Sequence, residues 1–200
     1  MNKLKKLVIT TGLIISMSAF TLNGTTEAAT TTHKVKSGET YWKIATKYGV
    51  PVNSLLNANN AKGSLLYAGT NLVIPNTTIT AAEKDLMARL VHAEAKGEPY
   101  AGKVAVATVI LNRVASPDFP NTINSVVYEK SNGHYAFTPV QNGAINQPSD
   151  AASRQAVNEA LAFKGQGNGS LFFYNPNTAV SKWIFSREVT VTIGNHRFAK

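Results

Sequence analysis

The 200-residue sequence contains no cysteine, and this absence removes two classes of protein from consideration. Without cysteine the chain can have neither a disulfide scaffold nor a thiol nucleophile. The sequence also lacks a cluster of lysine and arginine with interleaved aromatic residues, which is the pattern of a nucleic-acid-binding surface. We therefore expect no nucleic-acid partner, although the formal net charge is +9.

Long hydrophobic runs are also absent. The most apolar stretch, residues 7–23, is uncharged, but Thr, Ser and Gly interrupt it, and it is too short to favour a permanent membrane span. Lysines precede this stretch and small residues follow it, which is the order of a secretory signal peptide. We expect residues 1–29 to be this signal, with cleavage near Ala28 or Ala29. The alternative is an uncleaved signal that anchors the protein in the membrane.

The balance of charges indicates where an exported chain would go. Lysine and arginine together number 20, whereas aspartate and glutamate number 11. A secreted protein with this excess of positive charge is attracted to an anionic polymer such as a cell wall. We therefore expect the protein to be secreted and associated with a wall.

Two short polar linkers, residues 30–32 and 76–80, divide the rest of the chain. The first domain, residues 33–75, shows the order strand, helix, helix, strand. Thr40 is placed to cap the first helix, and Gly49 is placed to end it. The predicted elements cover residues 33–35, 41–48, 52–57 and 72–74.

The second domain, residues 81–200, is predicted to be mostly helical, with a small antiparallel sheet at its C-terminal end. Apolar residues first recur at helical spacing, and the period then changes to the alternation that is typical of strands. Gly194-Asn195 is a two-residue hairpin signal between the last two strands. The whole chain is therefore predicted to be an α+β protein. Helices are expected after Thr80 and at 103–114, 122–128 and 151–163, and strands at 171–174, 189–193 and 196–198.

The first helix of this domain has clear start and stop signals. Thr80 and Glu83 form a capping box, in which each side chain satisfies a backbone N–H at the start of the helix. Lys96 and Gly97 supply the stop, because a cation suits the last turn and glycine can adopt a left-handed conformation after it.

Glu94 lies at helical spacing from Leu86 and Leu90, on the face of this helix that should enter the core. Burial disfavours the ionised form of a carboxyl group, so it raises the pKa and makes a proton donor for neutral pH. The alternative is that Glu94, at the end of this face, simply reaches water. Other carboxylates, such as Glu83 and Glu129, indicate helix caps or solvated faces.

The histidines offer a metal site as another alternative. His92, His134 and His196 could join Glu94 in a zinc centre of the kind that zinc-dependent amidases use. However, His92 and Glu94 are two residues apart on a helix and point about 200° away from one another, which makes joint ligation awkward. We therefore expect no metal and no other cofactor.

Residues 33–75 resemble a LysM module over their whole length. The matching motifs are V-K-S-G-E-T-Y-W-K-I-A near the start, N-A-N-N in the middle and L-Y-A-G-T-N-L-V-I-P at the end. The resemblance implies binding to the N-acetylglucosamine-containing glycans of peptidoglycan or chitin. It places the binding groove between Gly38 and Thr40 on one side and Asn57 and Asn59 on the other. The alternative for the asparagines is helix capping and turn formation.

Residues 81–200 resemble the spore cortex-lytic, or SleB-type, cell-wall hydrolase family. The matching motifs are H-A-E-A-K-G-E-P-Y-x-G-K-V-A-V-A-x-V-I-L-N-R-V, F-T-P-V-Q-N-G, L-F-F-Y-N-P and G-N-H-R-F. The resemblance implies a fold related to goose-type lysozyme and soluble transglycosylases. It also implies lytic transglycosylase activity on spore cortex, in germination, or on vegetative peptidoglycan, with Glu94 as the catalytic acid.

Further candidate residues lie in the other motifs. Thr138 and Gln141 could hydrogen-bond sugar groups, and Tyr174 could stack on a sugar face, whereas Trp183 is expected in the core. Glu98 follows Glu94 in a turn, with a role at the substrate edge or in the structure. The expected partner is peptidoglycan, and the sequence identifies no regulatory protein. The alternatives are a hydrolytic muramidase, an N-acetylmuramoyl-L-alanine amidase and a non-catalytic wall-binding protein.

Overall fold

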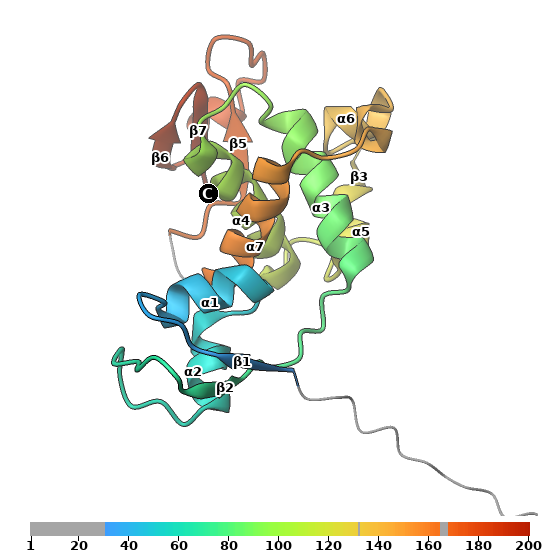
Figure 1. Ribbon diagram of the computed structural model, residues 1–200. Coiled ribbons are helices and arrows are strands. Elements are labelled where there is room, and N and C mark those ends of the chain that lie inside the picture. The colour runs from blue at the N-terminus through green and yellow to red at the C-terminus, as the bar shows by residue number, and fades with distance from the viewer. Residues whose placement is uncertain (1–30, 132, 165–167) are drawn as a thin grey trace, which may run out of the picture.

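The computed structural model describes residues 31–131, 133–164 and 168–200 (Figure 1). The expected signal peptide, residues 1–29, lies outside the described residues. Among the helices that are described, none is both long and apolar enough to cross a membrane.

The N-terminal part of the structure is a small module with its own core. Its strands pair in antiparallel fashion, with His33 opposite Leu72. Ile44, Leu55 and Leu72 are among its buried residues. The predicted order of strand, helix, helix and strand is confirmed. The elements are β1 (Thr32–Lys34), α1 (Tyr41–Tyr48), α2 (Val52–Ala58) and β2 (Asn71–Val73).

Helices make up most of the larger part, and α4 is central among them. The helix α4 packs against both α3 and α7, and the contact faces are almost entirely apolar. Val106, Val109 and Ile110 of α4 are fully buried, as the apolar sequence of this segment predicts. The helices are α3 (Ala81–Glu94), α4 (Tyr100–Ala115), α5 (Ile123–Val127), α6 (Thr138–Gln141) and α7 (Ala151–Ala162), with 3-10 turns η1 (Ala144–Asn146) and η2 (Ile184–Ser186).

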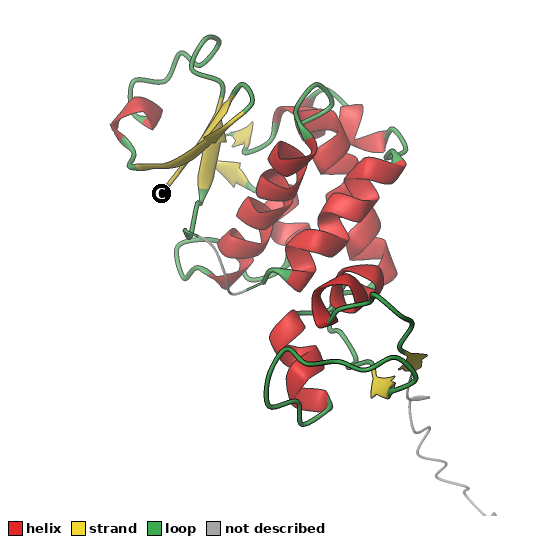
Figure 2. Ribbon diagram, turned by 60° about the vertical axis from the view of Figure 1, so that its left-hand side comes forward, coloured by secondary structure: helices red, strands yellow, loops and turns green. Residues whose placement is uncertain are grey.

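A three-stranded antiparallel sheet lies beside the helices (Figure 2). The strand β7 is in the middle, and its Phe198 is buried in the main core, which ties the sheet to the helices. Gly194, at a φ of 58°, forms the predicted turn between β6 and β7. A short hairpin of β3 and β4 was not predicted from the sequence. The strands are β3 (Lys130–Ser131), β4 (His134–Tyr135), β5 (Phe172–Tyr174), β6 (Val189–Ile193) and β7 (His196–Ala199).

Three local expectations are wrong. The helix α3 ends at Glu94 with Ala95 as its cap, before Lys96, and Gly97 is not among the glycines with positive φ. The segment around Thr138 forms the short helix α6, where no helix was expected. Trp183, expected in the core, is 51% exposed and covers Phe172 and Arg187 from outside.

The two parts of the chain meet where α1 packs on α7 (Figure 1). Lys84 of α3 donates hydrogen bonds to the carbonyl oxygens of Tyr48 and Gly49, each at 3.2 Å, at the end of α1. Trp42 of α1 meets Phe163 edge to face at 5.9 Å between ring centres. The small module is therefore held on the helical part by defined polar and aromatic contacts.

Candidate active site

Glu94 is the last residue of α3 and is half-buried at the end of the apolar face of that helix. The neighbouring face residues Leu90 and Val91 are fully buried, as the helical spacing predicts. Burial raises the pKa of Glu94 to about 7, and the positive charge of Arg113 acts in the opposite direction. About half of the Glu94 carboxyl groups therefore carry a proton at neutral pH, which suits a general acid.

Arg113 of α4 is the charged residue that acts on Glu94, and sequence reasoning did not single it out. Its side chain is buried, and its Nε donates a hydrogen bond of 2.8 Å to the carbonyl oxygen of Leu171. Its guanidinium carbon lies 4.9 Å from the ring centre of Phe119 and 5.0 Å from that of Phe137. The available signal was an arginine inside an otherwise apolar helical segment.

Glu129 is the third charged residue of this region, and the expectation that it caps a helix or faces solvent is wrong. One of its carboxylate oxygens, Oε2, is buried and has no hydrogen-bond partner among the described residues. Its negative charge raises the pKa of Arg113, against the larger effect of burial, which lowers it. The region therefore contains a buried cation with two carboxylates near it.

The surroundings of Glu98 lower the pKa of its carboxyl group, whereas those of Glu94 raise it. Its carboxylate accepts hydrogen bonds from the backbone N of Asn195 at 2.9 Å and from the side-chain Nδ2 at 3.1 Å. Partial burial raises the pKa of Glu98, but these hydrogen bonds, with the charges of His196 and Lys103, outweigh burial and lower it. Glu98 is therefore ionised at neutral pH and fastens the turn between β6 and β7.

The other candidate residues of the larger part lie in two places. Thr138 and Gln141 are exposed on α6, directly after Phe137, whose ring contacts Arg113. Tyr174 is only 8% exposed, and its ring packs edge to face on Phe185 at 5.3 Å. The structure thus places Thr138 near the Arg113 region, whereas Tyr174 belongs to a separate small core and is poorly placed to stack on a sugar.

The LysM candidates have mixed surroundings. Asn57 is exposed, and Gly38 adopts a φ of 77° in the turn before α1. Thr40 caps α1 by accepting a hydrogen bond from the backbone N of Lys43. Asn59 uses its amide group to hold the chain together, since it accepts from the backbone N of Val73 at 2.7 Å and donates to the carbonyl oxygen of the same residue at 2.8 Å. Thr40 is thus the predicted cap of α1, and the capping alternative for the asparagines fits Asn59, which is the C-cap of α2. A contact with glycan stays a prediction for all four residues.

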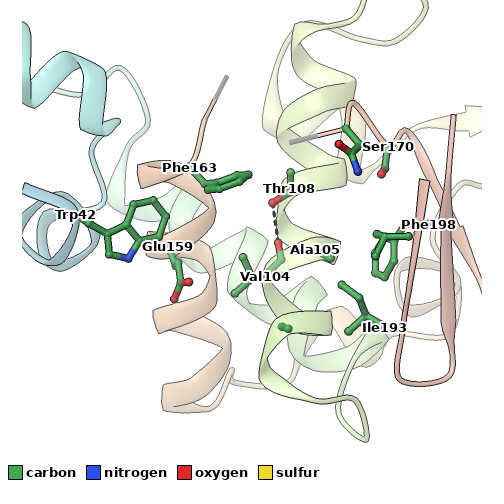
Figure 3. Close-up of a pocket in the computed structure, with 12 residues that line it drawn as sticks. Trp42, Val104, Ala105, Thr108, Glu159, Phe163, Ser170, Ile193 and Phe198 are labelled. Carbon is green, nitrogen blue, oxygen red and sulfur yellow. Dashed lines mark hydrogen bonds between the residues drawn. The ribbon is translucent and has the colours of Figure 1, made fainter. Parts of the chain in front are cut away.

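An apolar cavity of about 290 Å³ lies elsewhere, between α4, α7 and the sheet. Figure 3 shows Val104 and Thr108 of α4 facing Ile193 and Phe198 of the sheet across it, with Trp42 at its far side. Glu94 does not line this cavity. Its apolar lining offers no group for glycan cleavage except Glu159, whose carboxylate accepts a hydrogen bond from Tyr100, so we place the candidate site at Glu94.

The three histidines that were considered as metal ligands have different neighbours. Nδ1 of His92 lies 3.3 Å from a carboxylate oxygen of Asp150, His134 is exposed in β4, and His196 lies against Phe173 with ring centres 5.4 Å apart. Within residues 31–131, 133–164 and 168–200, no group of three or more histidine, aspartate and glutamate side chains is placed to hold a metal ion.

Comparison with known proteins gives the family. A family model described as cell wall hydrolase matches residues 97–199, and a LysM domain model matches residues 33–75. The match to the first begins just after α3, so Glu94 precedes it.

Two curated relatives are spore cortex-lytic enzymes. The chain is 46% identical to that of Halalkalibacterium halodurans over 113 residues, which are 56% of this chain and 33% of the relative. It is 35% identical to the enzyme of Bacillus cereus over an alignment of 192 positions, which covers 80% of this chain and 73% of the relative. The share of the relatives that this chain spans thus ranges from about a third to about three quarters.

A solved structure agrees with these relatives. The catalytic domain of the germination-specific lytic transglycosylase SleB from Bacillus anthracis matches with a TM-score of 0.57 and 41% identity, over 64% of this chain and 100% of that one. That match confirms the mixed fold of helices and small antiparallel sheets. The chain therefore belongs to the cell wall hydrolase family, with a LysM domain ahead of the matched region.

Proposed function

We propose that the protein is an exported lytic transglycosylase that cleaves peptidoglycan glycan strands after N-acetylmuramic acid. The observation that carries this proposal is the half-buried carboxyl group of Glu94, whose pKa is raised to about 7. A general acid works best when its pKa is close to the working pH. The similarity to a solved lytic transglycosylase supports the same reaction.

Glu94 acts twice in the proposed reaction. The protonated carboxyl group first gives its proton to the glycosidic oxygen, and the bond between that oxygen and C1 of N-acetylmuramic acid breaks. The resulting carboxylate then removes the proton from the C6 hydroxyl of the same sugar, whose oxygen forms a new bond to C1. The products are a free hydroxyl on the leaving sugar and a 1,6-anhydro end, and Glu94 has regained its proton.

A single catalytic carboxylate is enough for this route. A glycosidase that uses water normally needs a second carboxylate, roughly 5–9.5 Å from the first. The C6 hydroxyl is part of the substrate, so proximity replaces activation by a second group. The carboxylate of Glu98, the nearest alternative in the sequence, is engaged by Asn195.

The two parts of the chain have different roles in this proposal. Residues 33–75 are the LysM module that binds glycan, residues 76–80 are a linker, and residues 81–200 are the catalytic domain. The signal peptide directs export, and the protein acts at the cell wall or the spore cortex. The names of the curated relatives favour the cortex, and the exposed positions Gly38 and Asn57 are the candidates for glycan contact.

Digestion of purified peptidoglycan with mass analysis of the fragments tests this proposal. We expect fragments with 1,6-anhydro ends, each lighter by one water than the product of hydrolysis, and no release of stem peptides. Glu94→Gln keeps the size of the side chain but cannot supply a proton, so we expect it to abolish cleavage. Glu188→Gln is a matched control, because Glu188 is an exposed carboxylate paired with Lys200 at 3.3 Å.

Each alternative predicts a different result. Reducing ends would identify a hydrolytic muramidase, free amino groups from stem peptides would identify an amidase, and binding without cleavage would identify a wall-binding protein. Full activity of a folded Glu94→Gln variant would remove Glu94 from the mechanism.

A further inference from the structure

We propose that Glu129 is a positioning residue for this reaction, and that its charge neutralises Arg113 so that Glu94 can stay protonated. This inference rests on the proposed function of Glu94. Glu129 does not need to touch the substrate, because it acts through Arg113, on which the charges of both carboxylates act.

The guanidinium of Arg113 is fixed in one place. It is buried, with only 8% of the residue exposed, and it donates from Nε to the carbonyl oxygen of Leu171 at 2.8 Å. Three phenyl rings lie around it, with their centres 4.9, 5.0 and 5.6 Å from the guanidinium carbon. These rings belong to Phe119, Phe137 and Phe172. The rings stabilise the cation in part, but a buried charge also needs an opposite charge near it.

The fold brings Glu129 to this cation. The helix α5 lies beside both α3 and α4, and Glu129 follows its end (Figure 1). The backbone carbonyl of Glu129 accepts a hydrogen bond of 2.9 Å from the N of Ala136, which closes the hairpin of β3 and β4. The residue after Ala136 is Phe137, one of the rings around Arg113. The position of Glu129 is therefore coupled to that of the phenyl rings around Arg113.

The buried oxygen of Glu129 is stabilised by no hydrogen bond within the described residues. Its Oε2 accepts no hydrogen bond there, and a carboxylate oxygen in that state is costly unless a cation compensates it. Neither Glu129 nor Glu94 forms a direct ion pair with Arg113 in the described part of the chain, so both act on it at longer range. Of the two, Glu129 acts on Arg113 more strongly.

The charges of Arg113 and Glu129 together influence whether Glu94 keeps its proton. While Glu94 is protonated, Glu129 is the carboxylate that balances Arg113. Without the charge of Glu129, the cation would favour the ionised form of Glu94, since an opposite charge stabilises a carboxylate. Glu94 would then lose its proton at a lower pH and would be a poorer acid at neutral pH.

Three other charged groups, Lys103, His92 and His196, act on carboxylates other than Glu94. Lys103 of α4 donates from Nζ to the carbonyl oxygen of Ala95 at 2.6 Å, and its charge acts on Glu98 and Asp150. On α3 itself, His92 faces Asp150 of the α7 cap. From the sheet, His196 acts on Glu98. Arg113 is thus the charged neighbour whose effect reaches Glu94.

The alkaline limb of the pH–activity profile tests this inference, because it reports loss of the proton from Glu94. Cleavage of purified peptidoglycan by the full chain is measured from pH 5 to pH 9 for the wild type, Glu129→Gln and the control Glu188→Gln. We expect Glu129→Gln to move the midpoint of this limb down by about one pH unit. Its rate at pH 7 should fall about fivefold and its rate at pH 5 should stay within about twofold of the wild type. Glu188→Gln should leave the midpoint in place.

Glu129→Asp provides a second variant that keeps a charge. We expect its midpoint between those of the wild type and Glu129→Gln, because the carboxylate is withdrawn by one methylene. If Glu129→Gln does not fold, Glu129→Asp alone decides the question. A folded variant whose midpoint equals that of the wild type, or lies above it, would overturn the inference. A structural role for Glu129 would lower activity at all pH values without moving the midpoint.

Failure of this inference is distinguishable from failure of the proposed function. If Glu94→Gln abolishes cleavage but Glu129→Gln leaves the midpoint unchanged, only the role of Glu129 is lost. If a folded Glu94→Gln variant cleaves normally, the proposed function fails, whatever the profile of Glu129→Gln.

Discussion

Glu98 and Asn195 are joined by two hydrogen bonds across 97 residues of sequence, from the backbone N at 2.9 Å and from Nδ2 at 3.1 Å. Glu98 lies in the turn just after the helix that ends with Glu94, yet the pKa of Glu98 is lowered and that of Glu94 is raised to about 7. Two carboxyl groups whose environments separate their pKa values can take different roles. One fastens the fold, and the other remains available as an acid.

Glu98→Gln should therefore weaken the fold. We expect the free energy of unfolding to fall by about 1 kcal/mol, because the hydrogen bonds from Asn195 lose a charged acceptor. Urea denaturation measures this change. Asn195→Ala should have a similar effect, and the double variant should lose less than the sum, as expected for groups in direct contact. Fully additive losses would show that the two hydrogen bonds do not stabilise the fold.

Glu94→Gln should stabilise the protein at alkaline pH. The folded-state pKa of Glu94 lies above the ordinary value of 4.5, so its stabilising contribution is complete below about pH 4.5 and is lost as the pH rises through 7. Glutamine does not ionise and avoids this loss. We expect equal stability at pH 4 and a gain of about 2 kcal/mol for the variant at pH 8. Thermal unfolding at both pH values measures the difference, and an equal difference at both would argue against burial as the cause.

Gly49→Ala should loosen the contact between the two parts of the chain. Gly49 has a φ of 60°, and a Cβ there would lie 2.6 Å from Oδ1 of Asn158 and 2.7 Å from Nζ of Lys84. Gly69, with a φ of 89° and no atom within 4 Å of such a Cβ, is the matched control. Both variants should lose about 1 kcal/mol from backbone strain, and only Gly49→Ala should lose more. Equal losses in urea denaturation would mean that the contact adapts freely.

Asp150→Ala should weaken the start of α7. The carboxylate of Asp150 accepts a hydrogen bond of 2.6 Å from the backbone N of Ser153. Contacts with the side chain and backbone of Ser153 lower the pKa of Asp150 to about 2. We expect a loss of about 1 kcal/mol at pH 6.

The pH dependence of that loss follows from the lowered pKa. The stabilising contribution of ionised Asp150 is present above about pH 3.8 and disappears as the pH falls through 2, so the loss in Asp150→Ala should shrink over that range. Asp150→Asn keeps a capping oxygen without the charge and should show a smaller loss with little dependence on pH. A loss for Asp150→Ala that stays constant down to pH 2 would contradict the charged cap.

Local sequence rules predicted the longer helices well, whereas the short helix α6 was missed. The capping box of Thr80 and Glu83 forms as expected, and the apolar spacing of Leu86 and Leu90 correctly places Glu94 at the edge of the core. These signals act within one or two helical turns, so a single sequence contains them. The two-residue turn at Gly194 is local in the same way.

Long-range relationships were not predictable in this way. Arg113, Glu129 and Phe137 come from three separate segments, and nothing in their spacing shows that they gather around one point. The contact of Glu98 with Asn195 depends on how the sheet is placed against α4, which no local pattern specifies. Trp183 was expected in the core on hydrophobicity alone, but its exposed ring lies over the guanidinium of the half-buried Arg187.

The pKa of the Glu94 carboxyl group is the quantity on which the mechanism depends. It can be measured directly by carbon-13 NMR titration of protein labelled at the glutamate carboxyl carbon, with Glu94→Gln used to assign the signal. We predict a midpoint at about pH 7, equal to the midpoint of the alkaline limb of peptidoglycan cleavage. A Glu94 signal that titrates near the ordinary value of 4.5, while cleavage continues to neutral pH, would contradict its proposed role as the proton donor.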